Sequence, residues 1–198
     1  MIMATDALLR LAGPATWLAA VALFLSGIAL ALFFAGAGEF WGPVNDALLV
    51  VTAIALVPAV VAVWRLIADH GSWWPILSIA TVAGLILIAV GQTLLIVGRL
   101  SLDGSYVTGG VGVLPFLVWM LAVALLAVGG GVLTPATGWL AAASLAAIVA
   151  ASAIAVVTGG APLWAASIAV LVLLTAWLVA LGTALGTPAT AATRMSLG

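Results

Sequence analysis

Residues 74–97 read WPILSIATVAGLILIAVGQTLLIV, and this stretch decides the fold class. It carries no charged residue, and it is longer than the ~20 mostly apolar residues that an α-helix needs to cross a membrane. Tryptophan stands at its start, where an indole ring prefers the headgroup zone of a bilayer. The stretch therefore predicts a membrane-spanning helix.

Working outward from this stretch, five others have a similar length and apolar character. Clusters of glycine and proline separate them, and these are the strongest local breakers of regular structure. The predicted further spans are residues 14–35, 43–66, 108–128, 135–157 and 162–185. We predict an all-α, polytopic transmembrane helix bundle with six spans. Residues 1–198 would form one domain with no soluble part.

The fourth and fifth spans leave an alternative open. Pro115 falls in the first turns of the predicted fourth span, so that helix could start there instead. The fifth is rich in alanine and glycine, which makes it only weakly hydrophobic. Five spans with a re-entrant segment are therefore the second prediction for the architecture.

Composition supports the membrane assignment and excludes several kinds of site. Hydrophobic residues make up 67% of the chain and charged residues 5%, whereas soluble domains have about 45–50% and 25%. Four scattered arginines and no lysine argue against nucleic-acid binding, which needs clustered positive charge. The chain has no cysteine, and His70 is its one histidine. We therefore expect no metal site and no cofactor.

The arginines also predict an orientation, because positive residues favour the cytoplasmic side. With six spans, Arg10, Arg65 and Arg194 share one side and Arg99 lies on the other. We expect the N- and C-termini to be cytoplasmic and the protein to lie in the plasma (inner) membrane of a cell.

Four polar residues form the candidate site: Asn45, Asp46, Gln92 and Arg99. Each also has a structural interpretation. Asp46 complements the dipole of a helix start and Asn45 can cap it, Gln92 can bond between helices, and Arg99 can snorkel to headgroups. The functional interpretation is a polar pocket that is formed if Asp46, Gln92 and Arg99 converge.

Small residues and two tryptophans predict how the helices pack. Gly27, Ala31 and Ala35 are spaced by four residues, and Gly84, Gly91 and Gly98 by seven. Such stripes let helix backbones approach in a membrane, either within one chain or between two copies. Trp119 and Trp177 lie deep in their spans, where we expect them to pack between helices.

One stretch carries a family resemblance: Gly38-Glu39-Phe40-Trp41-Gly42-Pro43-Val44-Asn45-Asp46, followed by an apolar span with Pro58. It resembles uncharacterised small multi-span membrane proteins of bacteria, over about 30 residues around the first helical hairpin. The resemblance implies a similar hairpin and no particular activity.

Three functions are weighed from these features. No set of nucleophile, base and acid can be assembled, so the first hypothesis is not an enzyme. It is a structural or accessory subunit that contacts lipids and packs with other membrane proteins, with a homo-oligomer as a further possibility. The second is a transporter or channel for a small or lipophilic solute. The third is an intramembrane enzyme acting on lipid, with Asp46, Glu39 or His70 as base.

Overall fold

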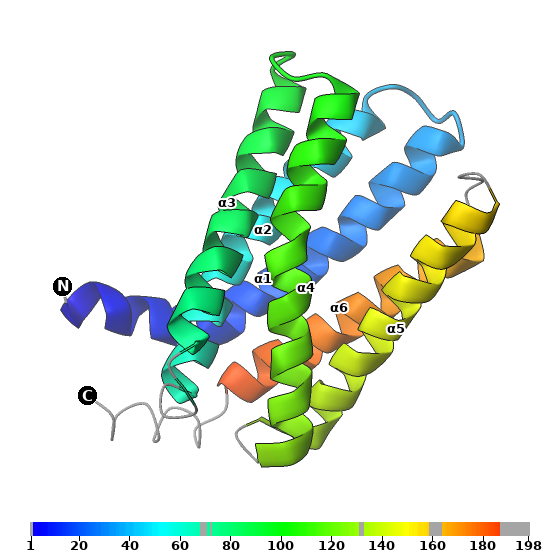
Figure 1. Cartoon of the computed structure of the whole chain (residues 1–198). Coiled ribbons are helices and arrows are strands. Elements are labelled where there is room, and N and C mark those ends of the chain that lie inside the picture. The colour runs from blue at the N-terminus through cyan, green and yellow to red at the C-terminus, as the bar shows by residue number, and fades with distance from the viewer. Residues whose placement is uncertain (1, 68–70, 72, 131–132, 159–163, 187–198) are drawn as a thin grey trace.

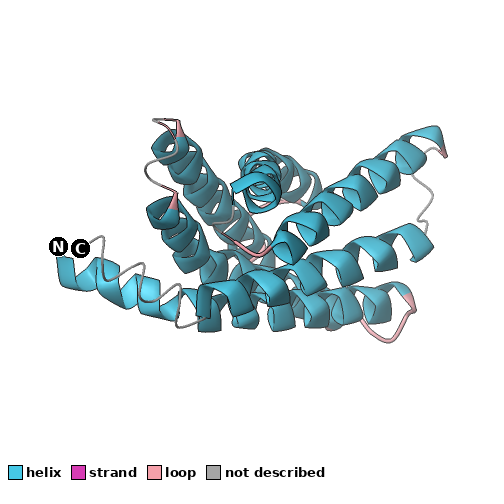
Figure 2. Cartoon of the chain, turned by 90° about the horizontal axis from the view of Figure 1, so that it is seen from below, coloured by secondary structure: helices cyan, strands magenta, loops and turns pink. Residues whose placement is uncertain are grey.

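The computed structural model describes residues 2–67, 71, 73–130, 133–158 and 164–186. The side chains of residues 2–8, Gly130 and Trp164 are not described. Within these ranges every regular element is a helix (Figure 2). The helices are α1 (Ile2–Phe34), α2 (Trp41–Leu66), α3 (Trp74–Ile96), α4 (Leu102–Gly130), α5 (Pro135–Val157) and α6 (Trp164–Gly186). His70 and Arg194 lie outside the described residues.

All six helices are long and apolar enough to cross a membrane, so the chain is a polytopic membrane protein. Each helix packs against the next in the chain, and α6 also packs against α1 (Figure 1). The six helices therefore follow one another around a closed ring.

The two ends of the bundle are named here by their connections. The upper end carries residues 35–40 and 97–101; at the lower end α2 ends and α3 begins, and α4 ends and α5 begins (Figure 1). At the upper end, Gly36 and Gly98 stop α1 and α3 in the left-handed region, with φ of 76° and 70°. The Arg99 amide then donates to the Leu94 carbonyl at 2.8 Å, which closes a Schellman motif.

The prediction of six spans is confirmed, and two of the predicted starts are wrong. α1 starts at Ile2 instead of Pro14, and its first turns lie at an angle to the rest of the helix (Figure 1). α4 starts at Leu102 instead of residue 108, so Pro115 lies inside the helix and does not begin it. The Pro115 carbonyl accepts a hydrogen bond from the Thr81 hydroxyl at 3.2 Å, which ties α4 to α3.

Glycine packing explains why α3 and α4 lie so close. A Cβ placed on Gly84 would meet the Gly112 carbonyl oxygen at 2.3 Å, and one on Gly112 would meet the Gly84 oxygen at 2.6 Å. Gly91 packs against the side chain of Thr108. The third residue of the predicted stripe, Gly98, ends the helix instead of packing.

The same principle joins α1 to α6. A Cβ on Gly13 would come within 2.9 Å of the Gly186 Cα, and Gly27 faces Leu171. Ala31 and Ala35 are exposed, so they do not continue the Gly27 stripe within the chain. Packing of this stripe between two copies stays a prediction. α1 ends in a Schellman turn just beyond Phe34.

An aromatic cluster fills the centre of the ring. Trp119 on α4 and Trp177 on α6 are fully buried, with ring centroids 6.1 Å apart, and both contact Phe116. α4 and α6 are not neighbours around the ring, so these side chains meet across it. The expectation that both tryptophans pack between helices is confirmed.

Candidate functional site

A chain of hydrogen bonds links α1 to α2 in the upper part of the bundle. The Ser26 hydroxyl donates to the Asn45 Oδ1 at 2.6 Å, and the Asn45 Nδ2 donates to the Asp46 Oδ1 at 3.1 Å. Ser26 and Asn45 are buried, whereas Asp46 is half-buried. Asn45 therefore uses both ends of its amide to fix the Asp46 carboxylate against α1.

Asn45 does not cap α2. The residue before the helix is Phe40, and no side chain caps the helix start there. Asn45 lies one turn inside α2 and is buried, so an unpaired amide there would be costly. Ser26 supplies the partner, so Asn45 serves as an interhelical link.

Asp46 also faces a groove between α2 and α3. Counting along α2, Asp46 shares a face with Val50, Ala53 and Val57, because these positions follow it by four, seven and eleven residues. Those three residues line a groove of about 590 Å³. Asp46 therefore stands one turn above the groove, toward the upper end.

The groove itself is almost entirely apolar. Thr93 is its one polar lining side chain, and the Thr93 hydroxyl already donates to the Ala89 carbonyl at 2.8 Å. Ile54, Ile86 and Val90 are exposed along its edges, so the groove opens sideways to the membrane. The lining residues are Val50, Ala53, Ile54, Val57, Pro58, Leu85, Ile86, Ala89, Val90, Thr93 and Leu94.

Gln92 lies on the same face of α3 as Leu85, which it follows by seven residues. Leu85 is buried and lines the groove. The Gln92 carboxamide oxygen is buried and accepts no hydrogen bond from a described residue. Gln92 is not among the residues that line the groove.

Arg99 lies in the connection between α3 and α4, and its side chain is exposed. In the described part of the chain, no hydrogen bond or ion pair joins Arg99 or Gln92 to Asn45 or Asp46. The structure thus brings together two of the four candidate residues, and a single ligand site made by all four stays a prediction.

Ser26 is the site residue that sequence reasoning missed. A serine in an apolar span is common, and its partner lies 19 residues away on another helix. The sequence could have indicated this contact, because Ser26 is a polar residue late in the first span and Asn45 is one early in the second. In an antiparallel hairpin these two positions come to the same depth.

Ser26→Ala tests this link. We expect it to lower the free energy of unfolding by about 0.6–1.7 kcal/mol, because a buried amide oxygen loses its donor in a membrane setting. Thermal unfolding in detergent, followed by circular dichroism, measures the change. Thr183→Val is the matched control, since the Thr183 hydroxyl is exposed and bonds only to its own helix at Val179. Equal stability of the two variants would contradict the link.

No family model matches the sequence, and no curated protein or solved structure matches it. The resemblance of residues 38–46 to small bacterial membrane proteins therefore stays a prediction.

Proposed function

We propose that the protein is a non-enzymatic accessory subunit that packs against another membrane protein through α5. The observation that carries this proposal is an exposed seam of small residues along α5. Residues on this face recur at alternating steps of three and four, the spacing of a helix that packs against a partner helix. The α5 seam consists of Ala143, Ala146, Ala150 and Ala153, and it is flanked by Trp139 and Val157.

The exposure of α5 supports this role. Only 11% of its central membrane segment is buried in the molecule, whereas the other five spans have 28–44% buried. The buried residues of α5 are Thr137, Gly138, Ala141 and Ser144, and Gly138 packs against α4. The α5 seam is therefore left uncovered by the chain's own helices.

The chemistry of an uncovered alanine seam favours a helix as its partner. In a bilayer, helices gain little by hiding apolar surface from lipid, so they associate where small side chains let backbones approach closely. A helix face that contacts only lipid can carry larger side chains equally well. The seam's regular spacing over three turns favours a transmembrane helix of another protein.

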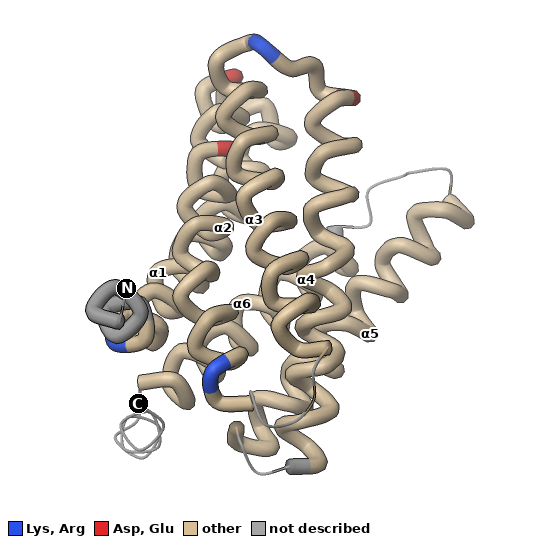
Figure 3. Tube along the Cα trace, turned by 60° about the vertical axis from the view of Figure 1, so that its left-hand side comes forward, with Lys and Arg blue, Asp and Glu red and all other residues tan. Residues whose placement is uncertain are grey.

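The rest of the molecule agrees better with an accessory role than with transport. Charged positions of the described residues lie toward the two ends of the bundle (Figure 3). The aromatic cluster of Phe116, Trp119 and Trp177 occupies the centre of the ring, where a solute would have to pass. These features support a packing surface as the means of action.

A pair of adjacent residues tests the proposal. Ala150 lies on the α5 seam, and Val149 beside it is 67% exposed but points elsewhere. A photoreactive amino acid at position 150 is expected to cross-link one stoichiometric membrane protein in native membranes, and the same group at position 149 is not. Equal cross-linking at both positions, or none at position 150, would contradict the proposal. A cross-linked product of twice the chain's mass would show that the partner is a second copy of this chain.

Larger side chains at positions 150 and 149 give a quantitative test through the amount of complex recovered. Ala150→Leu is expected to reduce the recovered complex about 10-fold, because a clash worth about 1.4 kcal/mol changes an equilibrium by that factor. Val149→Leu should leave recovery unchanged. Native gel electrophoresis after mild detergent extraction measures both.

A further inference from the structure

We propose that the groove between α2 and α3 binds a phospholipid with a primary ammonium headgroup, which pairs with Asp46 while one acyl chain fills the groove. The inference is independent of the proposed function, because the α5 seam lies on another helix. It rests on the shape of the groove, on its lining and on the charge beside it.

The shape and lining fit an acyl chain. A volume of about 590 Å³ lies within the ~300–1,000 Å³ of typical ligand sites. All lining side chains except Thr93 are apolar, and the Thr93 hydroxyl is already bonded within its own helix. Because the groove opens sideways between Ile54 and Ile86, a chain can enter it from the bilayer without crossing a polar barrier.

The charge at the upper end of the groove selects the headgroup. One Asp46 oxygen accepts from Asn45, and no described residue donates to the other. No arginine among the described residues forms an ion pair with Asp46, so its negative charge has no cationic partner there. A primary ammonium supplies both a positive charge and N–H donors at the depth where headgroups meet acyl chains.

Asn45 prepares the carboxylate for this partner. The Asn45 amide is held by Ser26 and fixes Asp46 Oδ1, so the carboxylate has little freedom left to lose when it binds. A quaternary ammonium has the same charge but no N–H to donate. The site should therefore prefer phosphatidylethanolamine to phosphatidylcholine.

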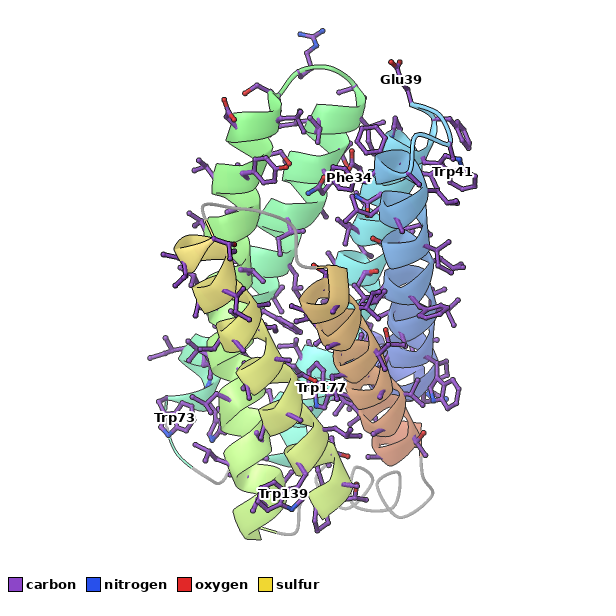
Figure 4. The ribbon with its side chains drawn as sticks, turned by 90° about the vertical axis from the view of Figure 1, so that its right-hand side faces the viewer. Phe34, Glu39, Trp41, Trp73, Trp139 and Trp177 are labelled. Atoms are coloured by element: carbon purple, nitrogen blue, oxygen red, sulfur yellow. The ribbon has the colours of Figure 1, made fainter. Side chains whose placement is uncertain are left out.

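Native mass spectrometry with equal amounts of these two lipids, matched in acyl chains, tests the preference. The wild-type chain is expected to retain phosphatidylethanolamine about five-fold over phosphatidylcholine, because one net hydrogen bond from the ammonium is worth about 1 kcal/mol. Asp46→Asn should lower the ratio, because a neutral amide oxygen accepts a weaker hydrogen bond from the ammonium than a carboxylate does. Glu39→Gln is the matched control, since Glu39 lies in the upper connection, away from the groove (Figure 4). The control should keep the wild-type ratio.

A second pair tests the acyl chain's place. Val90→Trp fills the groove from its exposed edge and should reduce the retained lipid of both kinds, whereas Val111→Trp on exposed α4 should not. An equal ratio of the two lipids on the wild-type chain would overturn the proposal. So would an unchanged ratio in Asp46→Asn, or equal retention by the two tryptophan variants.

Discussion

Trp177→Ala is expected to lower the free energy of unfolding by about 3–5 kcal/mol, the range for removing a large buried aromatic side chain. Trp177 is fully buried and meets Trp119 and Phe116 edge to face across the ring. Its loss removes the contact between two helices that are not neighbours, and it leaves a cavity at the centre. Chemical unfolding in mixed micelles, followed by far-ultraviolet circular dichroism, measures the change.

The indole nitrogen allows a sharper version of this test. The Trp177 Nε1 is buried and donates to no described residue, so Trp177→Phe removes a costly polar group together with part of the ring. Trp177→Phe should therefore cost much less than Trp177→Ala. Trp139→Ala is the matched control, because Trp139 is 64% exposed and should change stability by less than ~0.5 kcal/mol (Figure 4). Similar losses for Trp177→Ala and Trp139→Ala would show that the aromatic cluster does not hold the ring together.

Gly84→Ala is expected to cost at least about 1–3 kcal/mol, although it adds a single methyl group. The new Cβ would lie 2.3 Å from the Gly112 carbonyl oxygen, which is backbone and cannot rotate away. α3 and α4 would have to separate, and the bond from Thr81 to Pro115 would stretch with them. The midpoint of thermal unfolding in detergent gives the measurement.

Gly110→Ala provides the comparison for this substitution. Gly110 lies on α4 near Gly112, but a Cβ there meets nothing within 4 Å. Since alanine is about 0.8–1.0 kcal/mol better than glycine inside a helix, Gly110→Ala should be neutral or stabilising. If Gly84→Ala is as stable as Gly110→Ala, then the close approach of α3 and α4 does not require glycine at position 84.

The sequence was sufficient for the number of spans, because hydropathy over about 20 residues reports directly on what a bilayer accepts. The starts of α1 and α4 were harder to place. A helix can continue past its apolar part into polar residues such as Asp103, since backbone bonding does not depend on hydropathy. Pro115 misled for a related reason, because a transmembrane helix tolerates a proline in its interior.

The candidate site was predicted less completely than the fold. Asn45 and Asp46 are adjacent in the chain, so their pairing was open to sequence reasoning, whereas Ser26 depends on how α1 and α2 meet. The α5 seam was missed because a run of alanines does not reveal which of its faces stays uncovered. Only the packing of α4 and α6 against α5 separates the buried small residues from the exposed ones.

The contact between α1 and α6 has a consequence for biosynthesis. Chains are made and inserted from the N-terminus onward, so α1 enters the membrane long before its second neighbour exists. Until α6 emerges, the α1 surface around Gly13 and Gly27 faces lipid instead of Gly186 and Leu171. A ribosome that stops before residue 164 releases an open arc of helices whose first member still lacks its contacts with α6, and such a product is a natural substrate for membrane quality control.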